Sequence, residues 1–191
     1  VKEGLELDSE SPGTLEILSK NKENEFDCYT ATASFGQGIT VTPLQMASAF
    51  STIANGGTLF KPNIIKEIRH HDGRVEYKKP KEIRRVISPQ TASLVSGMLV
   101  NVVDNGQAKS ARVKGYYVAG KTGTAQIAGP GGYTEDYNHS FAGFTPIEDP
   151  KFVVVVKFEK PEVAFSANTA APVFADIAKF VLQYYQIPPN R

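Results

Sequence analysis

The sequence contains little of what disulfide-rich, metal-binding and membrane-spanning proteins need. Its single cysteine, Cys28, excludes an intrachain disulfide framework and a cysteine zinc cluster. The three histidines, His70, His71 and His139, do not have the spacing of a helical metal site. No apolar run approaches the roughly 20 residues that span a bilayer. We therefore predict no metal centre, no cofactor, and a buried free thiol at Cys28.

An excess of one charge is also lacking. The 21 basic and 20 acidic residues give a net charge of +1, and no long basic run argues for a nucleic-acid partner. The densest charged stretch, KEIRR at residues 81–85, is predicted to be solvated surface. With 41% hydrophobic residues over 191 positions, the chain has the balance of one soluble globular domain.

Residues 1–35 are predicted to be largely irregular. Pro12-Gly13 marks a turn, and KNKENE at residues 20–25 is a polar stretch. The acidic opening VKEGLELDSE has no features of a signal peptide. We interpret the chain as a piece of a longer polypeptide.

Three helices follow from cap residues and apolar spacing. Thr42, Pro43 and Gln45 form a capping box with proline in the first helical position, and this helix ends at Asn55-Gly56-Gly57. The second runs from Ser88-Pro89 to residues 104–106. The third enters at Pro172, and its predicted core-facing side comprises Val173, Phe174, Ile177, Phe180, Val181 and Tyr184.

The remaining patterns predict strands. A hairpin over residues 64–77 turns at Asp72-Gly73, which is typical of a two-residue turn. Residues 117–126, HSFAGFTP and residues 151–158 are predicted strands, and AGPGGYTEDYN at residues 128–138 a loop. The four valines of the last strand indicate burial on both faces. Because no helical pattern separates these strands, we predict an α+β fold with an antiparallel sheet flanked by helices.

The stretch GYYVAGKTGTAQ, residues 115–126, fits two catalytic motifs. It matches the phosphate loop G-x-x-x-x-G-K-[ST], and it contains K-T-G, a motif of serine acyl-transfer enzymes. Tyr117, Val118 and Ala119 favour extended backbone where a phosphate loop must curl. Glycines and Pro130 downstream prevent the helix that such a loop requires. We therefore favour a strand.

A strand would suit peptide binding. Lys121 and Gly123 would project to one side, and Thr122 and Thr124 to the other. A substrate can add to such a strand through main-chain hydrogen bonds, and a glycine allows its close approach. A lysine ammonium and a threonine hydroxyl can hold a carboxylate or polarise a serine. The backbone N–H of Thr124 can bind the oxyanion formed at an attacked carbonyl.

The wider sequence resembles a known family. GQGITVTPLQMASAFSTIANGGTLFKP, YYVAGKTGTAQ, HSFAGFTP, the valine strand and AAPVFADIAKF follow one another as in the C-terminal part of a class B penicillin-binding protein transpeptidase domain. The resemblance implies that residues 1–191 are the C-terminal portion of one such domain, with a partial penicillin-binding protein/serine β-lactamase-like fold. It implies a parent protein that cross-links peptidoglycan stem peptides as a D,D-transpeptidase and is acylated by β-lactams.

The resemblance also implies a cellular location for the parent protein and roles for individual residues. The parent would be anchored at the outer face of the cytoplasmic membrane by a segment outside this chain, with other cell-wall synthesis proteins as partners. Lys121 would belong to the polar network around the nucleophile, and Thr122 would bind the substrate carboxylate. Gly123 would leave room for the ligand. Thr124 would supply an oxyanion donor through its N–H and a second hydroxyl.

The chain departs from the family in the other two motifs. The family needs S-x-x-K and S-x-N before K-T-G. Ser19-Lys20-Asn21-Lys22 lies in a polar stretch, and Ser166-Ala167-Asn168 follows K-T-G, so we interpret both as accidents. We predict that the nucleophile lies upstream, outside this chain, and that the isolated chain is inactive. Two strands of the family sheet should also be missing, which favours self-association.

Alternatives remain open at this point. The chain could be a catalytically silent binding or scaffolding module of the same fold, a serine β-lactamase or a D-alanine carboxypeptidase. The block GQGITVTPLQMASAF favours the class B transpeptidase over these. A nucleotide-binding enzyme is a further alternative. Asn138-His139-Ser140 fits a glycosylation acceptor, which we attribute to chance.

Overall fold

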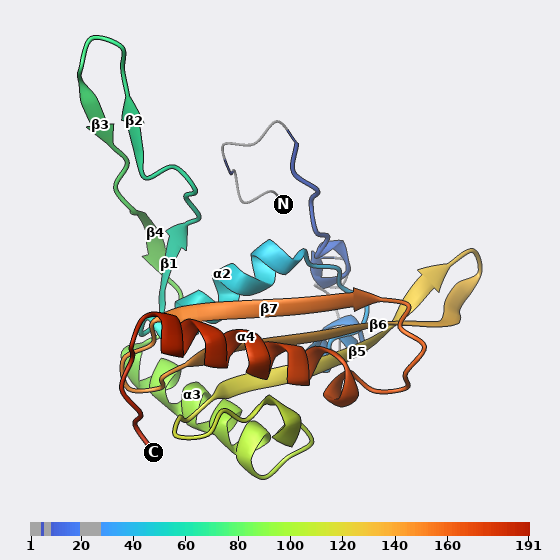
Figure 1. Cartoon of the computed structure of the whole chain (residues 1–191). Coiled ribbons are helices and arrows are strands. Elements are labelled where there is room, and N and C mark those ends of the chain that lie inside the picture. Colours follow the sequence, from blue (N-terminus) through green and yellow to red (C-terminus); the bar gives the residue numbers. More distant parts are fainter. Residues whose placement is uncertain (1–4, 6–8, 20–27) are drawn as a thin grey trace.

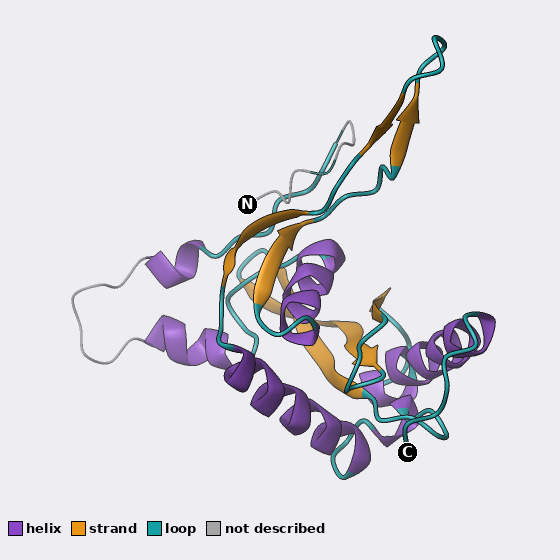
Figure 2. Ribbon diagram, turned by 90° about the vertical axis from the view of Figure 1, so that its left-hand side faces the viewer, coloured by secondary structure: helices purple, strands orange, loops and turns teal. Residues whose placement is uncertain are grey.

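A three-stranded antiparallel sheet forms the centre of the molecule (Figure 1). The computed structural model describes residue 5, residues 9–19 and residues 28–191. Its central sheet has the strand order β5-β6-β7, with bounds β5 Ala119–Gly129, β6 Gly132–Thr145 and β7 Phe152–Glu159. Helices cover both faces of this sheet (Figures 1 and 2). The predicted α+β fold with an antiparallel sheet is confirmed.

The two helices predicted from cap residues begin as expected, at Pro43 and Pro89, whereas the third begins at Ala170, two residues before the predicted Pro172. Thr42 Oγ1 accepts the N–H of Gln45 at 3.1 Å, and Gln45 Oε1 accepts the N–H of Thr42 at 2.9 Å. Among the described helices, none is long and apolar enough to cross a bilayer. The bounds are α1 Cys28–Ser34, α2 Pro43–Ala54, α3 Pro89–Asp104 and α4 Ala170–Tyr184, with 3₁₀ turns η1 Glu16–Ser19, η2 Lys109–Ala111 and η3 Ser166–Asn168.

Two apolar layers hold the sheet. Toward α4, the rings of Phe141 and Phe174 lie 4.6 Å apart within a buried cluster that also contains Val118, Val156, Ala178 and Leu182. On the opposite face, α2 and α3 pack over a second cluster, which comprises Phe50, Ala119, Ala142 and Phe144. The valines of β7 contact both layers, Val154 and Val156 on one face, Val153 and Val155 on the other. Both faces of β7 are therefore covered, although only Val156 is fully buried and the other three valines are half-buried.

The N-terminal region is more ordered than predicted. Residues 28–34 form α1, and η1 precedes them, where irregular structure was expected. Cys28 is exposed, so the prediction of a buried thiol was wrong. None of the residues of α1 is buried, so its sequence has no apolar periodicity from which a helix could be predicted. Residues 20–25, predicted to be polar surface, lie outside the described residues.

The predicted loop at residues 128–138 is a hairpin. β5 continues to Gly129, β6 begins at Gly132, and the two strands stay paired with one irregularity between Gln126 and Ala128. Positive φ angles of 92° at Gly131 and 140° at Gly132 permit the tight turn. This hairpin is largely exposed, and its residues lack the apolar alternation from which a strand is recognised.

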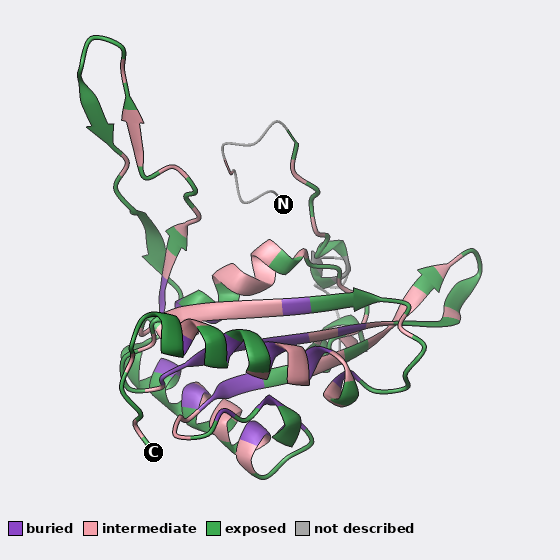
Figure 3. Cartoon of the chain, in the orientation of Figure 1, coloured by how far each residue is buried: buried purple, intermediate pink, exposed green. Residues whose placement is uncertain are grey.

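A narrow arm projects from the sheet (Figures 1 and 3). The strands β1 Thr58–Lys61 and β4 Lys81–Arg85 form its base, and β2 Glu67–Arg69 and β3 Val75–Tyr77 its outer part. The predicted two-residue turn was wrong. The backbone N–H of His70 donates to the Arg74 carbonyl at 2.9 Å, and the backbone N–H of Gly73 donates to the His70 carbonyl at 3.0 Å. The loop between His70 and Arg74 therefore has three residues, with φ of 86° at Gly73.

The charges of the arm pair locally. The stretch at residues 81–85 is exposed as predicted, although it is a strand. A hydrogen bond from Arg74 lowers the pKa of Asp72, and one from Lys78 lowers the pKa of Glu76. These pairs join residues two positions apart on one exposed ribbon, as ordinary surface ion pairs do, and such pairs contribute little to stability.

Helix α4 turns a different side to the core than predicted. Phe174 is buried as expected, but Ile177, Phe180 and Tyr184 are 38%, 66% and 70% exposed. The buried side is formed instead by Ala170, Ala171, Phe174, Ala178 and Leu182. Alanines let the helix backbone approach the sheet closely. Because apolar residues surround most of this helix, periodicity alone does not select the core-facing side.

Replacement of Phe174 by alanine tests the α4 layer. We expect Phe174→Ala to lower the free energy of unfolding by about 3–5 kcal/mol, because it opens a cavity against Phe141. Lys179→Ala, at an exposed position of the same helix, should change it by less than about 0.5 kcal/mol. Urea denaturation of both variants gives the comparison. Equal effects of the two substitutions would contradict the assigned core.

Candidate active-site strand

The K-T-G segment lies in β5, an edge strand of the central sheet. Lys121 pairs with Ala142, Gly123 with Ser140, and Thr124 with His139 of β6. Within the described residues, no strand pairs with the other edge of β5. The backbone stays extended to Gly129, and no helix begins at Lys121. The alternative of a phosphate loop, and with it the nucleotide-binding enzyme, is therefore excluded.

The side chains of β5 alternate as predicted. Lys121 lies opposite Ala142, which belongs to the cluster under α2 and α3. Thr122 lies opposite Phe141, which belongs to the cluster under α4. Thr124 is two residues further along and contacts Ser166, in the turn that precedes α4. Lys121 and Gly123 thus share one face, and Thr122 and Thr124 the other.

The Lys121 ammonium folds back along its own strand. It is exposed, and its Nζ donates to the Thr122 carbonyl at 2.9 Å and to Thr122 Oγ1 at 3.5 Å. A cationic donor and a hydroxyl donor are therefore neighbours at this point of β5. Together they can bind a carboxylate, whose oxygens accept hydrogen bonds from both kinds of donor.

At Gly120 and Gly123, side chains of the neighbouring strand occupy the space that a Cβ would take. A Cβ at Gly120 would lie 2.3 Å from the Phe141 ring, and one at Gly123 would lie 2.5 Å from Ser140 Oγ. The glycine of K-T-G thus accommodates a side chain of the neighbouring strand. Ser140 stands beside it on the Lys121 face. The sequence did not single out this serine as part of the site.

Ser166 contacts the K-T-G strand, which the sequence did not reveal. Its triplet was dismissed as a chance S-x-N match. The structure places its hydroxyl 2.9 Å from Thr124 Oγ1, on a side chain that is 2% exposed. It therefore supports the K-T-G strand from the α4 side and does not act as a middle motif before it. No short motif joins two residues 42 positions apart, so sequence spacing could not reveal the contact.

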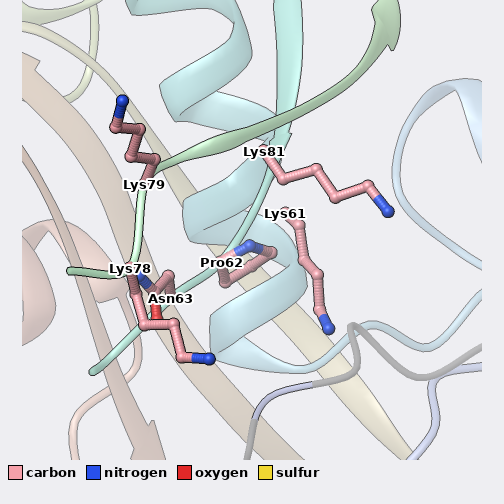
Figure 4. A pocket seen from close by; sticks show the side chains of 6 residues that line it. All are labelled: Lys61, Pro62, Asn63, Lys78, Lys79 and Lys81. Carbon is pink, nitrogen blue, oxygen red and sulfur yellow. The ribbon is translucent and has the colours of Figure 1, made fainter. Parts of the chain in front are cut away.

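Two hollows of the described surface lie away from β5. A cavity of about 160 Å³ at the arm is lined by Lys61, Pro62, Asn63, Lys78, Lys79 and Lys81 (Figure 4). Figure 4 shows the Lys79 side chain pointing away from the other three lysines, so the ammonium groups do not converge. A second hollow, of about 210 Å³, lies between α2 and the start of β7. Neither contains a residue of β5.

Asn138 is not placed as a glycosylation acceptor. It lies within β6, the central strand, and pairs with Ala125 on one side and Glu159 on the other. An acceptor site is expected on a surface loop. Its neighbour His139 is 1% exposed. The geometry agrees with a chance match.

Comparison with known proteins matches most of the chain to one family. Residues 1–179 match the penicillin binding protein transpeptidase domain. Stage V sporulation protein D of Bacillus subtilis is 38% identical over 100% of this chain and 30% of its own length. The peptidoglycan D,D-transpeptidase FtsI homolog of Mesostigma viride is 33% identical over 92% of this chain and 31% of its own length.

Solved structures agree. Apo penicillin-binding protein 3 of Mycobacterium tuberculosis superimposes with a TM-score of 0.88 at 33% identity, covering 100% of this chain and 45% of that one. The same protein in complex with ampicillin superimposes with a TM-score of 0.76 at 36% identity, covering 84% of this chain and 38% of that one. The chain spans about 30% of the length of the curated relatives it matches. It belongs to the penicillin-binding protein transpeptidase family, among the relatives of the class B enzymes.

Proposed function

We propose that the protein containing this chain is a peptidoglycan D,D-transpeptidase. A serine Oγ attacks the carbonyl carbon of the penultimate D-alanine of a stem peptide, and the terminal D-alanine leaves with a proton on its nitrogen. An amine of a second stem peptide then attacks the acyl ester, forms the cross-link and returns the serine hydroxyl. β-Lactams enter the same first step, with the ring nitrogen as the leaving group that stays attached.

One observation carries this proposal: the K-T-G strand lies at an open sheet edge with a cation and a hydroxyl side by side. A stem peptide can add along this edge as a further strand. Lys121 contributes positive charge next to the nucleophile, and Thr122 Oγ1 donates to the substrate carboxylate. Gly123 keeps the backbone free of a side chain where the peptide approaches.

The backbone N–H of Thr124 is proposed as an oxyanion donor. Residues of an edge strand direct their N–H and C=O groups alternately to the partner strand and outward. The Thr122 carbonyl is reached by the Lys121 ammonium, which supports its outward direction. Thr124 is two positions further and shares that direction. Loss of one oxyanion donor typically costs about 3 kcal/mol of transition-state stabilisation.

The nucleophile is proposed to come from a part of the protein outside residues 1–191. Ser166 is buried on the α4 side, away from Lys121, and is engaged with Thr124. Of the Ser19–Lys22 quartet, only Ser19 lies within the described residues, where it ends a 3₁₀ turn. Ser140 faces the Lys121 side but is half-buried in the central strand. Neither Ser140 nor Ser166 begins a buried helix with a lysine one turn later.

A cell-envelope location follows from the proposed substrate. Stem peptides are cross-linked outside the cytoplasmic membrane, so we propose that the protein acts at its outer face, anchored by a segment outside this chain, among other cell-wall synthesis proteins. A silent binding module of the same fold would not be acylated at all. A serine β-lactamase or D-alanine carboxypeptidase would be acylated but would pass the acyl group to water, so product analysis separates the three.

Labelling with a fluorescent penicillin tests the location of the nucleophile. We expect the complete gene product to form a covalent adduct and the 191-residue chain alone to form none, because the attacking serine lies outside it. Gel fluorescence and mass spectrometry of tryptic peptides give the result. An adduct on Ser140, Ser166 or any other serine of this chain would refute the assignment.

Removal of the lysine ammonium tests the K-T-G strand. In the complete protein, Lys121→Ala should reduce the acylation rate constant by about 100-fold, the effect typical of losing one preorganised electrostatic contact. Lys114→Ala, in the exposed loop before β5, should stay within about twofold of the unchanged protein. A stopped-flow or gel time course measures both. Equal rates for the two variants would exclude Lys121 from the site.

The isolated chain carries an unpartnered apolar row on α4. Ile177, Phe180 and Tyr184 recur along its outer face, and the Phe180 and Tyr184 rings stack with centroids 6.1 Å apart. Exposed apolar patches of this kind favour association. The outer edge of β7 is likewise unpaired among the described strands. We propose that the isolated chain self-associates through this row.

Light scattering after size exclusion tests self-association. We expect a dimer or larger species for the 191-residue chain and a monomer for Phe180→Glu, because the charge disrupts an apolar contact. Leu94→Glu is the matched control, since Leu94 is 62% exposed on α3, away from the row. A monomeric unchanged chain, or equal dissociation by both substitutions, would contradict the proposed surface.

A further inference from the structure

A buried serine makes two contacts with the exposed threonine after K-T-G. Ser166 Oγ lies 2.9 Å from Thr124 Oγ1, and the Ser166 backbone N–H donates to the same oxygen at the longer distance of 3.5 Å. Ser166 is 2% exposed, whereas Thr124 is exposed at the open edge of β5. The threonine hydroxyl is therefore held from behind while its outer side remains accessible.

The position of Ser166 is set independently of Thr124. Ser166 begins η3, the turn that leads into α4. Ser110, next to it in space, donates its hydroxyl to the Ala167 carbonyl. Thr169 Oγ1 bonds to His139 Nδ1 at 3.0 Å, and His139 is the cross-strand partner of Thr124. Because these two contacts anchor the turn, Ser166 can orient the threonine side chain rather than follow it.

The chemistry of two hydroxyls gives the contact a direction. A hydroxyl donates once and accepts at two lone pairs. The Ser166 N–H can only donate, so it occupies one lone pair of Thr124 Oγ1. A carboxylate only accepts, and its presence beside Thr124 selects the arrangement in which the Ser166 hydroxyl donates as well. The Thr124 proton then points to the ligand, and each bond polarises the next.

We propose that Ser166 is a positioning residue that turns the Thr124 hydroxyl into a donor for the carboxylate of the stem peptide or β-lactam. This inference rests on the proposed transpeptidase function. Ser166 touches no substrate in this role, and it acts only through Thr124. A purely structural serine, by contrast, would affect the turn before α4 whether or not position 124 carries a hydroxyl.

A double-mutant cycle in the complete protein tests the proposal. The variants are Ser166→Ala, Thr124→Val and the double substitution, and the measurement is the acylation rate constant with a fluorescent penicillin. We expect Ser166→Ala alone to reduce it about tenfold, in the range for a hydrogen bond that serves a charged group. In the Thr124→Val background, the same change should have no further effect.

Two comparisons make the test specific. Ser93→Ala removes an exposed serine of α3, outside both β5 and the turn before α4, and it should change acylation by less than about twofold. The reduction of the acylation rate constant by Ser166→Ala should also be confined to the penicillin with a free carboxylate. The methyl ester of the same penicillin lacks that carboxylate and should acylate the unchanged protein and the Ser166→Ala variant at equal rates. Melting temperatures verify folding, and Ser166→Cys, which keeps the size and a weak donor, replaces the alanine variant if that one unfolds.

The outcomes separate the two proposals. Unchanged acylation of Ser166→Ala, an additive loss in the double variant, or an equal loss for the methyl ester would overturn the positioning role. No adduct on the unaltered complete protein would overturn the transpeptidase function itself. An adduct together with coupling between positions 124 and 166 supports both.

Discussion

Strand β5 is held by backbone hydrogen bonds from β6 along one edge, and this one-sided pairing determines the rest of the site. The register with β6 decides which side chains face α2 and α3 and which face α4. It also decides which N–H and C=O groups are consumed in the sheet and which point outward. A ligand strand, a carboxylate and an oxyanion can all use what this pairing leaves open. A shift by one residue would exchange the two faces and remove the site.

The two core layers keep that register in place. Phe141 fills the space that the missing side chain of Gly120 leaves, and Ser140 does the same at Gly123. The glycines near Lys121 therefore serve the packing of the sheet as well as access to its edge. At Gly120 a side chain would collide with the buried Phe141 ring, whereas at Gly123 only the Ser140 side chain would have to move.

The turn before α4 connects the α4 layer with the K-T-G strand. His139 and Thr169 join it to the central strand, and Ser166 reaches Thr124 at the edge. Thr169 uses its hydroxyl for this contact and makes no side-chain cap on α4. The N-terminus of α4 therefore lacks a side-chain cap, and the hydrogen bond between Thr169 and His139 instead fixes the turn beside the central strand.

Local patterns in the sequence determined the capped starts of α2 and α3, the extended backbone at Lys121, and the two faces of β5 and β7. Each of these depends on neighbours within a few residues, through a cap, a two-residue period or the absence of a curling glycine. The contact of Ser166 with Thr124, the buried side of α4 and the exposure of Cys28 were decided by tertiary packing. These features depend on which segments, far apart in the sequence, come into contact in the folded chain. The identity of an apolar residue or a serine does not specify the residue that it will contact.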